Sequence, residues 1–135
     1  MTREELCSIP LTESKIRILD ERIKALRVAA TSLSAPLSPD KVQSSGAGDR
    51  IARIVANIVD VEAEMKETQI RLAELKVEAN RLVDELPEPE QSVMALRYCC
   101  GYTWARVADE TGYDERYVYK IGARALSILF PDRHC

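Results

Sequence analysis

The side chains best suited to chemistry lie near the C-terminal end of the chain, and they suit binding rather than catalysis. Arg116, Lys120 and Arg124 are spaced four apart, so on a helix they share one face. Cations in such a row can contact the phosphates of a nucleic acid, and arginine can also read guanine edges. The residues predicted to share this outward face are Glu115, Arg116, Tyr119, Lys120, Ala123, Arg124 and Ser127.

Residue types that support catalysis or metal binding are sparse. The single histidine, His134, lies in the C-terminal tail, and no glycine-rich phosphate-binding loop occurs. The cysteines form no C-x-x-C pair. They are Cys7, Cys99, Cys100 and Cys135. We therefore expect no enzyme activity, no metal site and no cofactor.

Three short helices are predicted around the cation row, at residues 90–100, 104–111 and 115–129. Gly101 ends the first helix, and Thr103 is a favourable N-cap for the second. Gly112 can adopt the left-handed turn conformation, and Asp114 caps the third helix. The second and third helices, joined by this glycine-containing turn, have the spacing of a helix-turn-helix.

Apolar residues of the three short helices fall on the faces that would meet beneath the cation row. They predict one small core, in which a small alanine permits close approach of the helices. Its expected members are Val93, Leu96, Trp104, Val107, Ala108, Val118, Ile121, Ala125 and Leu126.

Two longer helices with heptad repeats precede this motif. The first is predicted at residues 11–34, with apolar positions at alternating steps of three and four from Ile16 to Leu33. The second is predicted at residues 51–86, where the same steps run from Ile51 to Leu86 over about five heptads. A loop rich in proline, serine and glycine joins them at residues 35–48.

These elements predict an all-α fold, in which a long helical coiled-coil hairpin is followed by a small C-terminal helix-turn-helix domain. Pro87 and Pro89 end the long helix because proline lacks a backbone donor and disfavours helix in the preceding residue. We therefore predict an oligomerisation domain at residues 1–86 and a helix-turn-helix domain at residues 87–135.

The two heptad helices differ in length, and this difference bears on oligomeric state. The first helix is too short to cover the second, which leaves an apolar stripe from about Thr68 to Leu86 without a partner. Exposed stripes of this kind are unusual in monomers, so a homodimer or higher oligomer through the 51–86 heptads is expected. The alternative is that the C-terminal domain folds back over the stripe.

Composition limits the class of protein further. A content of 46% apolar and 30% charged residues is typical of a folded chain, and aromatic residues make up only 5%. The net charge is −3, and residues 86–135 hold six basic and seven acidic side chains, so a nucleic acid would have to meet a local basic patch. Without a signal-peptide core or an apolar run of about 20 residues, a cytoplasmic location with no membrane contact is expected.

The C-terminal motif resembles region 4 of sigma-70-type transcription factors. The similarity covers about 45 residues and lies in Leu96-Arg97-Tyr98, Gly101-Tyr102-Thr103-Trp104, Val107-Ala108, Thr111-Gly112-Tyr113 and the helix from Val118 to Leu126. The whole chain is also similar to small phage- and prophage-encoded proteins with such a C-terminus. These resemblances imply a sequence-specific transcription regulator that binds double-stranded DNA.

The resemblance also implies roles for individual residues. The start of the third helix would enter the major groove, with Glu115, Arg116, Tyr119 and Lys120 near base edges. Thr103, Arg106 and Arg124 would contact phosphates and fix the register.

Two other functions remain open from the sequence. The near-neutral C-terminal domain could be a protein-docking surface that engages RNA polymerase or another phage component. A small subunit of a phage DNA-packaging machine would also combine such a domain with coiled coils.

Overall fold

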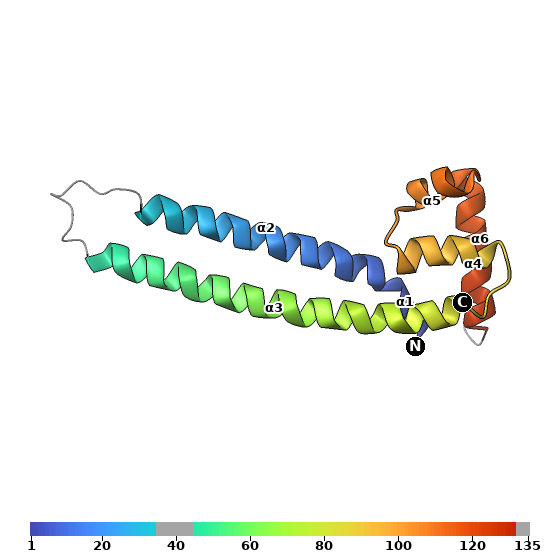
Figure 1. The fold of residues 1–135 in the computed structure, drawn as a ribbon, viewed down its shortest axis with the longest axis horizontal. Coiled ribbons are helices and arrows are strands. Elements are labelled where there is room, and N and C mark those ends of the chain that lie inside the picture. Colours follow the sequence, from blue (N-terminus) through green and yellow to red (C-terminus); the bar gives the residue numbers. More distant parts are fainter. Residues whose placement is uncertain (35–44, 132–135) are drawn as a thin grey trace. The chain divides into compact units, whose positions relative to one another are not determined.

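The computed structural model describes residues 1–34 and 45–131, and these form helices without a strand, which confirms the predicted all-α fold (Figure 1). Most of the predicted 35–48 loop lies outside the described residues, as do His134 and Cys135. The elements are α1 (Arg3–Cys7), α2 (Ile9–Ser34), α3 (Ser45–Val83), α4 (Glu90–Met94), the π-helical turn η2 (Ala95–Cys99), α5 (Trp104–Thr111) and α6 (Glu115–Leu129).

The chain divides into two compact units. Unit 2 is Ser14–Ile70, and unit 1 combines Met1–Glu13 with Arg71–Cys135. Helices α2 and α3 contribute residues to both units, so the division falls within these helices and not at residue 86, where the sequence suggested a boundary. An oligomerising role for residues 1–86 stays a prediction.

Unit 2 is a hairpin in which α2 and α3 lie side by side (Figure 1). Its core consists of predicted heptad positions, which confirms the hairpin seam. Two ion pairs border this seam, Lys15–Glu64 at 3.4 Å and Arg27–Glu62 at 2.8 Å. The core residues are Leu19, Ile23 and Val61, with Leu26, Ile58 and Met65 packed around them.

The predicted ends of the long helices needed correction. Helix α2 begins at Ile9 rather than at residue 11, and α3 runs from Ser45 to Val83 rather than from 51 to 86. Residues 45–48, which the sequence assigned to the loop, form the first turn of α3 and include Gly46 and Gly48. Pro87 and Pro89 disfavour helix in the residues before them, and α3 ends at Val83, three residues before Leu86.

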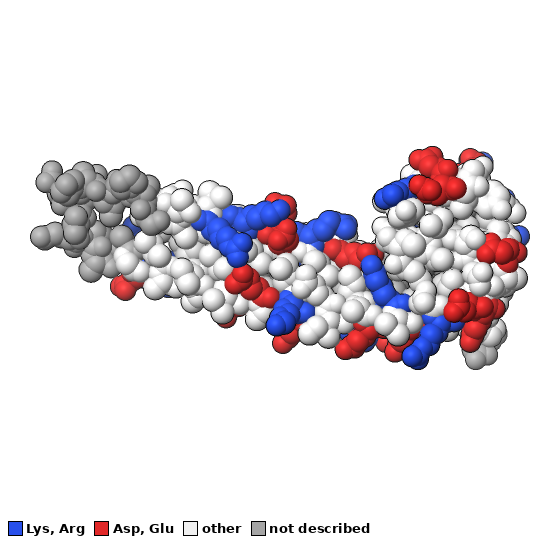
Figure 2. Space-filling model, in the orientation of Figure 1, with Lys and Arg blue, Asp and Glu red and all other residues white. Residues whose placement is uncertain are grey.

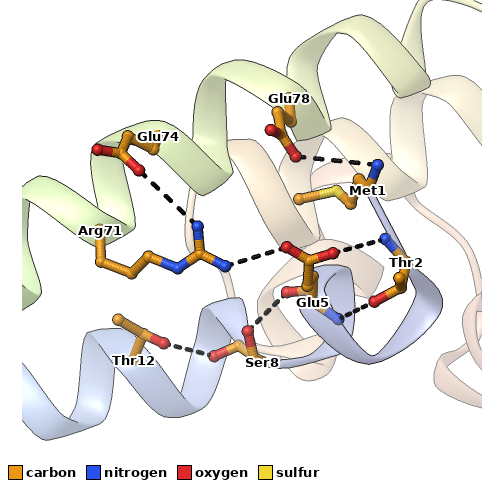
Figure 3. A network of polar contacts seen from close by, with 8 residues as sticks. All are labelled: Met1, Thr2, Glu5, Ser8, Thr12, Arg71, Glu74 and Glu78. Carbon is orange, nitrogen blue, oxygen red and sulfur yellow. Dashed lines mark hydrogen bonds and ion pairs between the residues drawn. The ribbon is translucent and has the colours of Figure 1, made fainter.

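Helix α1 was not predicted, although its start has a sequence signature. Thr2 and Glu5 form a capping box, in which each side chain accepts a hydrogen bond from the backbone N–H of the other (Figure 3). Arg71 of α3 pairs with Glu5 at 3.0 Å and with Glu74 at 3.8 Å. The pKa of Glu5 is lowered, most strongly by the hydrogen bond from the Thr2 backbone N–H and next by the bond from Arg71.

The apolar stripe at the C-terminal end of α3 is covered by the chain itself. Leu75, Ala79 and Leu86 are buried within unit 1. The C-terminal segment therefore folds back over this stripe, as the alternative interpretation stated, and the exposed stripe that motivated a dimer does not exist in the structure. The cluster around them contains Leu6, Ile9, Val83, Met94, Tyr98 and Ala125.

A second core in unit 1 holds α5 and α6 together and contains most, but not all, of the residues predicted for it. Trp104 is partly buried at its edge, and Ala125 and Leu126 belong instead to the cluster on α3. The predicted helix 90–100 is split into α4 and η2, where the backbone hydrogen bonding widens to a π-helical turn. The buried residues of this core are Val93, Val107, Ala108, Val118 and Ile121.

Candidate nucleic-acid interface

Helices α5 and α6 have the bounds that the sequence predicted, but of the two expected N-caps only Thr103 makes its side-chain hydrogen bond. Thr103 is the N-cap of α5, and its side chain accepts a hydrogen bond from the Arg106 backbone N–H at 3.2 Å. Gly112 follows α5 with a φ of 77°, a conformation that favours glycine. Asp114 occupies the N-cap position of α6 without a side-chain capping bond. The two helices and their short turn are those of a helix-turn-helix.

The two faces of α6 differ sharply in character. Its inward face is buried through Val118, Ile121, Gly122 and Ala125, which packs the helix against α4 and α5. Every residue predicted to lie on the outward face is exposed. These are Glu115, Arg116, Tyr119, Lys120, Ala123, Arg124 and Ser127.

Arg116 and Lys120 are the two outward cations of α6 that are available for a ligand. Neither makes a hydrogen bond or an ion pair with the residues that the structure describes. They lie one helical turn apart on the N-terminal half of α6, the part of such a helix that reaches base edges in helix-turn-helix proteins.

Arg124, the third cation of the row, has a partner within the protein. Its Nε lies 3.3 Å from a carboxylate oxygen of Glu90, a residue with only 6% of its surface exposed. The Arg124 guanidinium also lies 5.9 Å from the Tyr117 ring centroid. Because the buried carboxylate needs this cation, Arg124 ties α6 to α4, and its predicted phosphate contact would compete with that role.

Tyr119 and Glu115 interact with each other on the outward face. The Tyr119 hydroxyl donates to a carboxylate oxygen of Glu115 at 3.0 Å, and this bond raises the pKa of Tyr119. The Tyr119 ring lies 5.5 Å from the Trp104 ring in a tilted arrangement. Tyr119 and Glu115, two of the four predicted base-contacting residues, are thus held in position by α5 and by α6 itself.

Arg106 is exposed on α5, and its guanidinium stacks on an aromatic ring. The guanidinium carbon lies 3.7 Å from the centroid of the Tyr102 ring. This stacking leaves the N–H groups in the plane of the guanidinium free to meet an anion, so the geometry is compatible with the predicted phosphate contact.

Two residues that support this surface were not identified from the sequence. Arg97 in η2 donates to the Tyr102 carbonyl at 3.1 Å and lies 4.8 Å from the Trp104 ring centroid. Gly122 leaves space for the same indole, because a Cβ there would lie 2.8 Å from Trp104 Cη2. A glycine in the middle of an apolar helical face was the only available signal for this close approach.

The charge around this surface is mixed. Of the described residues after position 86, Glu88, Glu90, Asp109, Glu110, Asp114 and Glu115 are acidic, against Arg97, Arg106, Arg116, Lys120 and Arg124. Basic and acidic side chains also alternate on the face of the molecule that Figure 2 shows. Two of the five cations, Arg97 and Arg124, are engaged inside the protein. Attraction to a polyanion would therefore depend on few side chains.

The described residues contain no cluster of three or more histidine, cysteine or acidic side chains that could hold a metal ion. No helix within residues 1–34 and 45–131 is long and apolar enough to cross a membrane.

Comparison with protein-family models, with curated proteins and with solved structures finds no match to this chain.

Proposed function

We propose that the chain is a DNA-binding transcription regulator of the phage and prophage type, which contacts double-stranded DNA through α5 and α6. The observation that carries this proposal is the pair Arg116 and Lys120, which are exposed on the N-terminal half of α6 and have no hydrogen-bond or ion-pair partner within residues 1–34 and 45–131. The turn at Gly112 and the core of Val107, Val118 and Ile121 hold this helix so that its outward face is free to enter a groove.

The distribution of partners divides the predicted contacts into three groups. Arg116, Lys120 and Arg106 are placed to meet the duplex directly, while Tyr119 and Glu115 form a pair that must open or shift before either reads a base. Arg124 belongs first to the protein, through Glu90. Most of the affinity is therefore assigned to three cations.

The test is a titration of fluorescent duplexes, selected from random DNA, with wild-type protein and with the double variant Arg116→Ala/Lys120→Ala. Loss of two contacts of about 1–3 kcal/mol each predicts at least a tenfold weaker complex. Arg53→Ala removes an exposed cation from α3 and should leave binding unchanged. Equal affinity of the double variant and the wild type would refute the proposal.

A second candidate function, docking of RNA polymerase or another phage component, is favoured by a groove in unit 1. This groove has a volume of about 540 Å³, and Glu88 and Glu110 lie on its border. Carboxylates that line a groove suit a basic protein segment better than they suit DNA. The remaining lining residues are Pro89, Ser92, Ala95, Leu96, Thr111 and Tyr113.

The two functions are separated by measuring the binding of purified, nuclease-treated RNA polymerase. If docking is the function, Glu110→Lys weakens binding while Arg116→Ala/Lys120→Ala retains it. If DNA binding is the function, only the cation variant changes the behaviour of the protein, and it does so toward duplexes.

A further inference from the structure

Helix α2 carries a second apolar row that the hairpin does not use. Starting from Ser14, its members follow at alternating steps of four and three, and all but Ser14 are exposed. Ile18 has 59% of its surface exposed and Val28 has 67%. An open surface depression follows this row and is lined by Ser14, Arg17, Ile18, Glu21, Arg22 and Ala25. We call the set Ser14, Ile18, Glu21, Ala25 and Val28 the α2 row.

Helix α3 carries a comparable row within unit 2. Its steps also alternate between four and three, all its members are exposed, and Val59 and Ile70 expose 57% and 53% of their surfaces. Small residues dominate it. We call the set Ala52, Ala56, Val59, Ala63, Lys66 and Ile70 the α3 row.

The two rows match each other when the helices are aligned in parallel at a constant offset of 45 residues. This register places a large residue opposite a small one in each apolar layer, as knobs-into-holes packing favours. It also pairs Glu21 with Lys66, the only charged member of each row. The layers are Ser14 with Val59, Ile18 with Ala63, Glu21 with Lys66, and Ala25 with Ile70.

The charges beside the rows agree with the same register. In a parallel pair of helices, a residue that flanks the seam pairs with a flanking residue of the partner five positions further along, counted after the 45-residue offset is applied. This rule brings Arg17 to Glu67 and Arg22 to Glu62, so two cations of α2 meet two carboxylates of α3. Glu62 already accepts from Arg27 in its own copy and would then be shared.

Other pairings of these rows do not match the charges. Pairing two α2 rows in parallel sets Glu21 against Glu21, and pairing two α3 rows sets Lys66 against Lys66. In an antiparallel coiled coil, the d positions of one helix face the a positions of the other. Glu21 is a d position of the α2 row, so in an antiparallel α2–α3 pair it would face an a position, Ala63 or Ile70, and not Lys66. Glu21 already pairs with Lys24 of its own helix at 3.4 Å, and of these pairings only the parallel α2–α3 pair brings the two row charges, Glu21 and Lys66, together.

We propose that unit 2 is a self-assembly module, in which the α2 row of one copy packs in parallel against the α3 row of another. In the hairpin α2 already meets α3 through a different face, so this second pairing needs a second copy of the chain. Each copy has one row of each kind, so two copies can pair both rows in a closed dimer, or pair one row each and leave the others open for further copies. In either case the chain associates as its concentration rises.

Charge reversal tests the assembly without DNA, by sedimentation velocity over a range of protein concentrations. Wild-type protein should form a dimer or a larger species of the 15.2 kDa chain. Glu21→Lys and Lys66→Glu each place like charges in the central layer and should weaken association about tenfold or more. The double variant Glu21→Lys/Lys66→Glu should associate like wild type, which excludes misfolding as the cause.

Mixing adds a control that a general effect of charge cannot imitate. An equimolar mixture of the two single variants restores opposite charges at each contact and should assemble, although neither variant does alone. Arg50→Glu reverses an exposed charge of α3 outside both rows and should have no effect. A wild-type mass of 15.2 kDa at all concentrations, or a mixture that stays dissociated, would overturn the proposal.

Discussion

At the scale of single residues, the indole of Trp104 organises the helix-turn-helix. It contacts the edge of Tyr98 at a centroid distance of 6.4 Å, the ring of Tyr119 at 5.5 Å and the guanidinium of Arg97 at 4.8 Å. These contacts connect η2, α5 and the outward face of α6. A change in the space around the indole should therefore reach the proposed DNA-binding residues.

Gly122 is the position where this space is tightest. Alanine would favour the helix by about 1 kcal/mol through its intrinsic propensity, but overpacking against a rigid ring costs about 1–3 kcal/mol. Because a Cβ would approach Trp104 Cη2 to 2.8 Å, we expect Gly122→Ala to lower the free energy of unfolding by about 1 kcal/mol in denaturant titrations. The exposed control Ala123→Ser should change it little, and a stabilised Gly122→Ala protein would disprove this packing.

Tyr98 should make stability depend on alkaline pH. Burial, followed by the influence of Cys7, raises the pKa of Tyr98 to about 12 from 10.0. Between these pH values Tyr98 is ionised in the unfolded chain but not in the folded chain. The contribution of Tyr98 to the free energy of unfolding is therefore fully present below pH 10 and is lost as the pH rises toward 12. Denaturant titrations at pH 9 and pH 11.5 should show a loss of about 1–2 kcal/mol that Tyr98→Phe removes. An identical pH dependence in both proteins would contradict this account.

The sequence predicted which residues lie on the exposed face of α6, but it did not predict which of them interact with other residues of the protein. Spacing alone placed Arg116, Lys120 and Arg124 on one exposed face, as the structure shows. It could not distinguish Arg124 from the other two, because Glu90 lies far away in the sequence and meets it only in the folded chain. Local periodicity carries no information about such contacts.

At the scale of elements, α4 and α6 are joined by the pair of Glu90 and Arg124. The glutamate is almost fully buried, whereas Arg124 exposes 53% of its side chain. Solvent screens the exposed cation, so the pair contributes less than a fully buried one. Its main effect is to neutralise a carboxylate that packing has removed from water.

This arrangement predicts how the pair responds to mutation. Arg124→Ala leaves the Glu90 carboxylate buried and unpaired, and should lower the free energy of unfolding by about 1–2 kcal/mol. Adding Glu90→Gln to that variant should recover part of the loss, because a neutral amide is cheaper to bury. Strictly additive losses in this double-mutant cycle would show that the pair is not coupled.

Elements with strong local signals were predicted well. Thr103 fixes the start of α5 through a local hydrogen bond and Gly112 its end through backbone preference, and Asp114 holds the N-cap position of α6 without a side-chain bond. The π-helical turn at Ala95–Cys99 was missed, since no residue in it breaks the helical pattern. Helix α1 was missed even though its capping box is visible in the sequence.

At the scale of the whole molecule, the stripe on α3 decides how oligomeric state is interpreted. Heptads show that this stripe must be covered, but they do not show whether the cover comes from another copy or from the same chain. Leu75 and Ala79 are buried by residues of unit 1, so the sequence-based argument for a dimer through this seam does not apply. The compact units also mix N-terminal and C-terminal segments, which no local pattern could reveal.

A core substitution distinguishes these two kinds of cover. In the Lys66→Glu variant, which we expect to be monomeric, Leu75→Ala should lower the free energy of unfolding by about 2–5 kcal/mol because it opens a cavity in the cluster of unit 1. Were the stripe instead an interface between copies, Leu75→Ala would weaken association, and the unfolding midpoint would depend on protein concentration.

The central claim, that the outward face of α6 meets a duplex with Arg116 and Lys120 near its base edges, is tested most directly by DNA affinity measured over a range of salt concentrations. Each lost phosphate contact reduces the slope of log K against log salt concentration by about 0.9. We predict that Arg116→Ala/Lys120→Ala weakens binding at least tenfold at low salt, whereas Arg106→Ala, which removes a phosphate contact, flattens this slope by about one. A wild-type protein that binds no duplex at low salt, or a double variant with an unchanged affinity and slope, would contradict the claim.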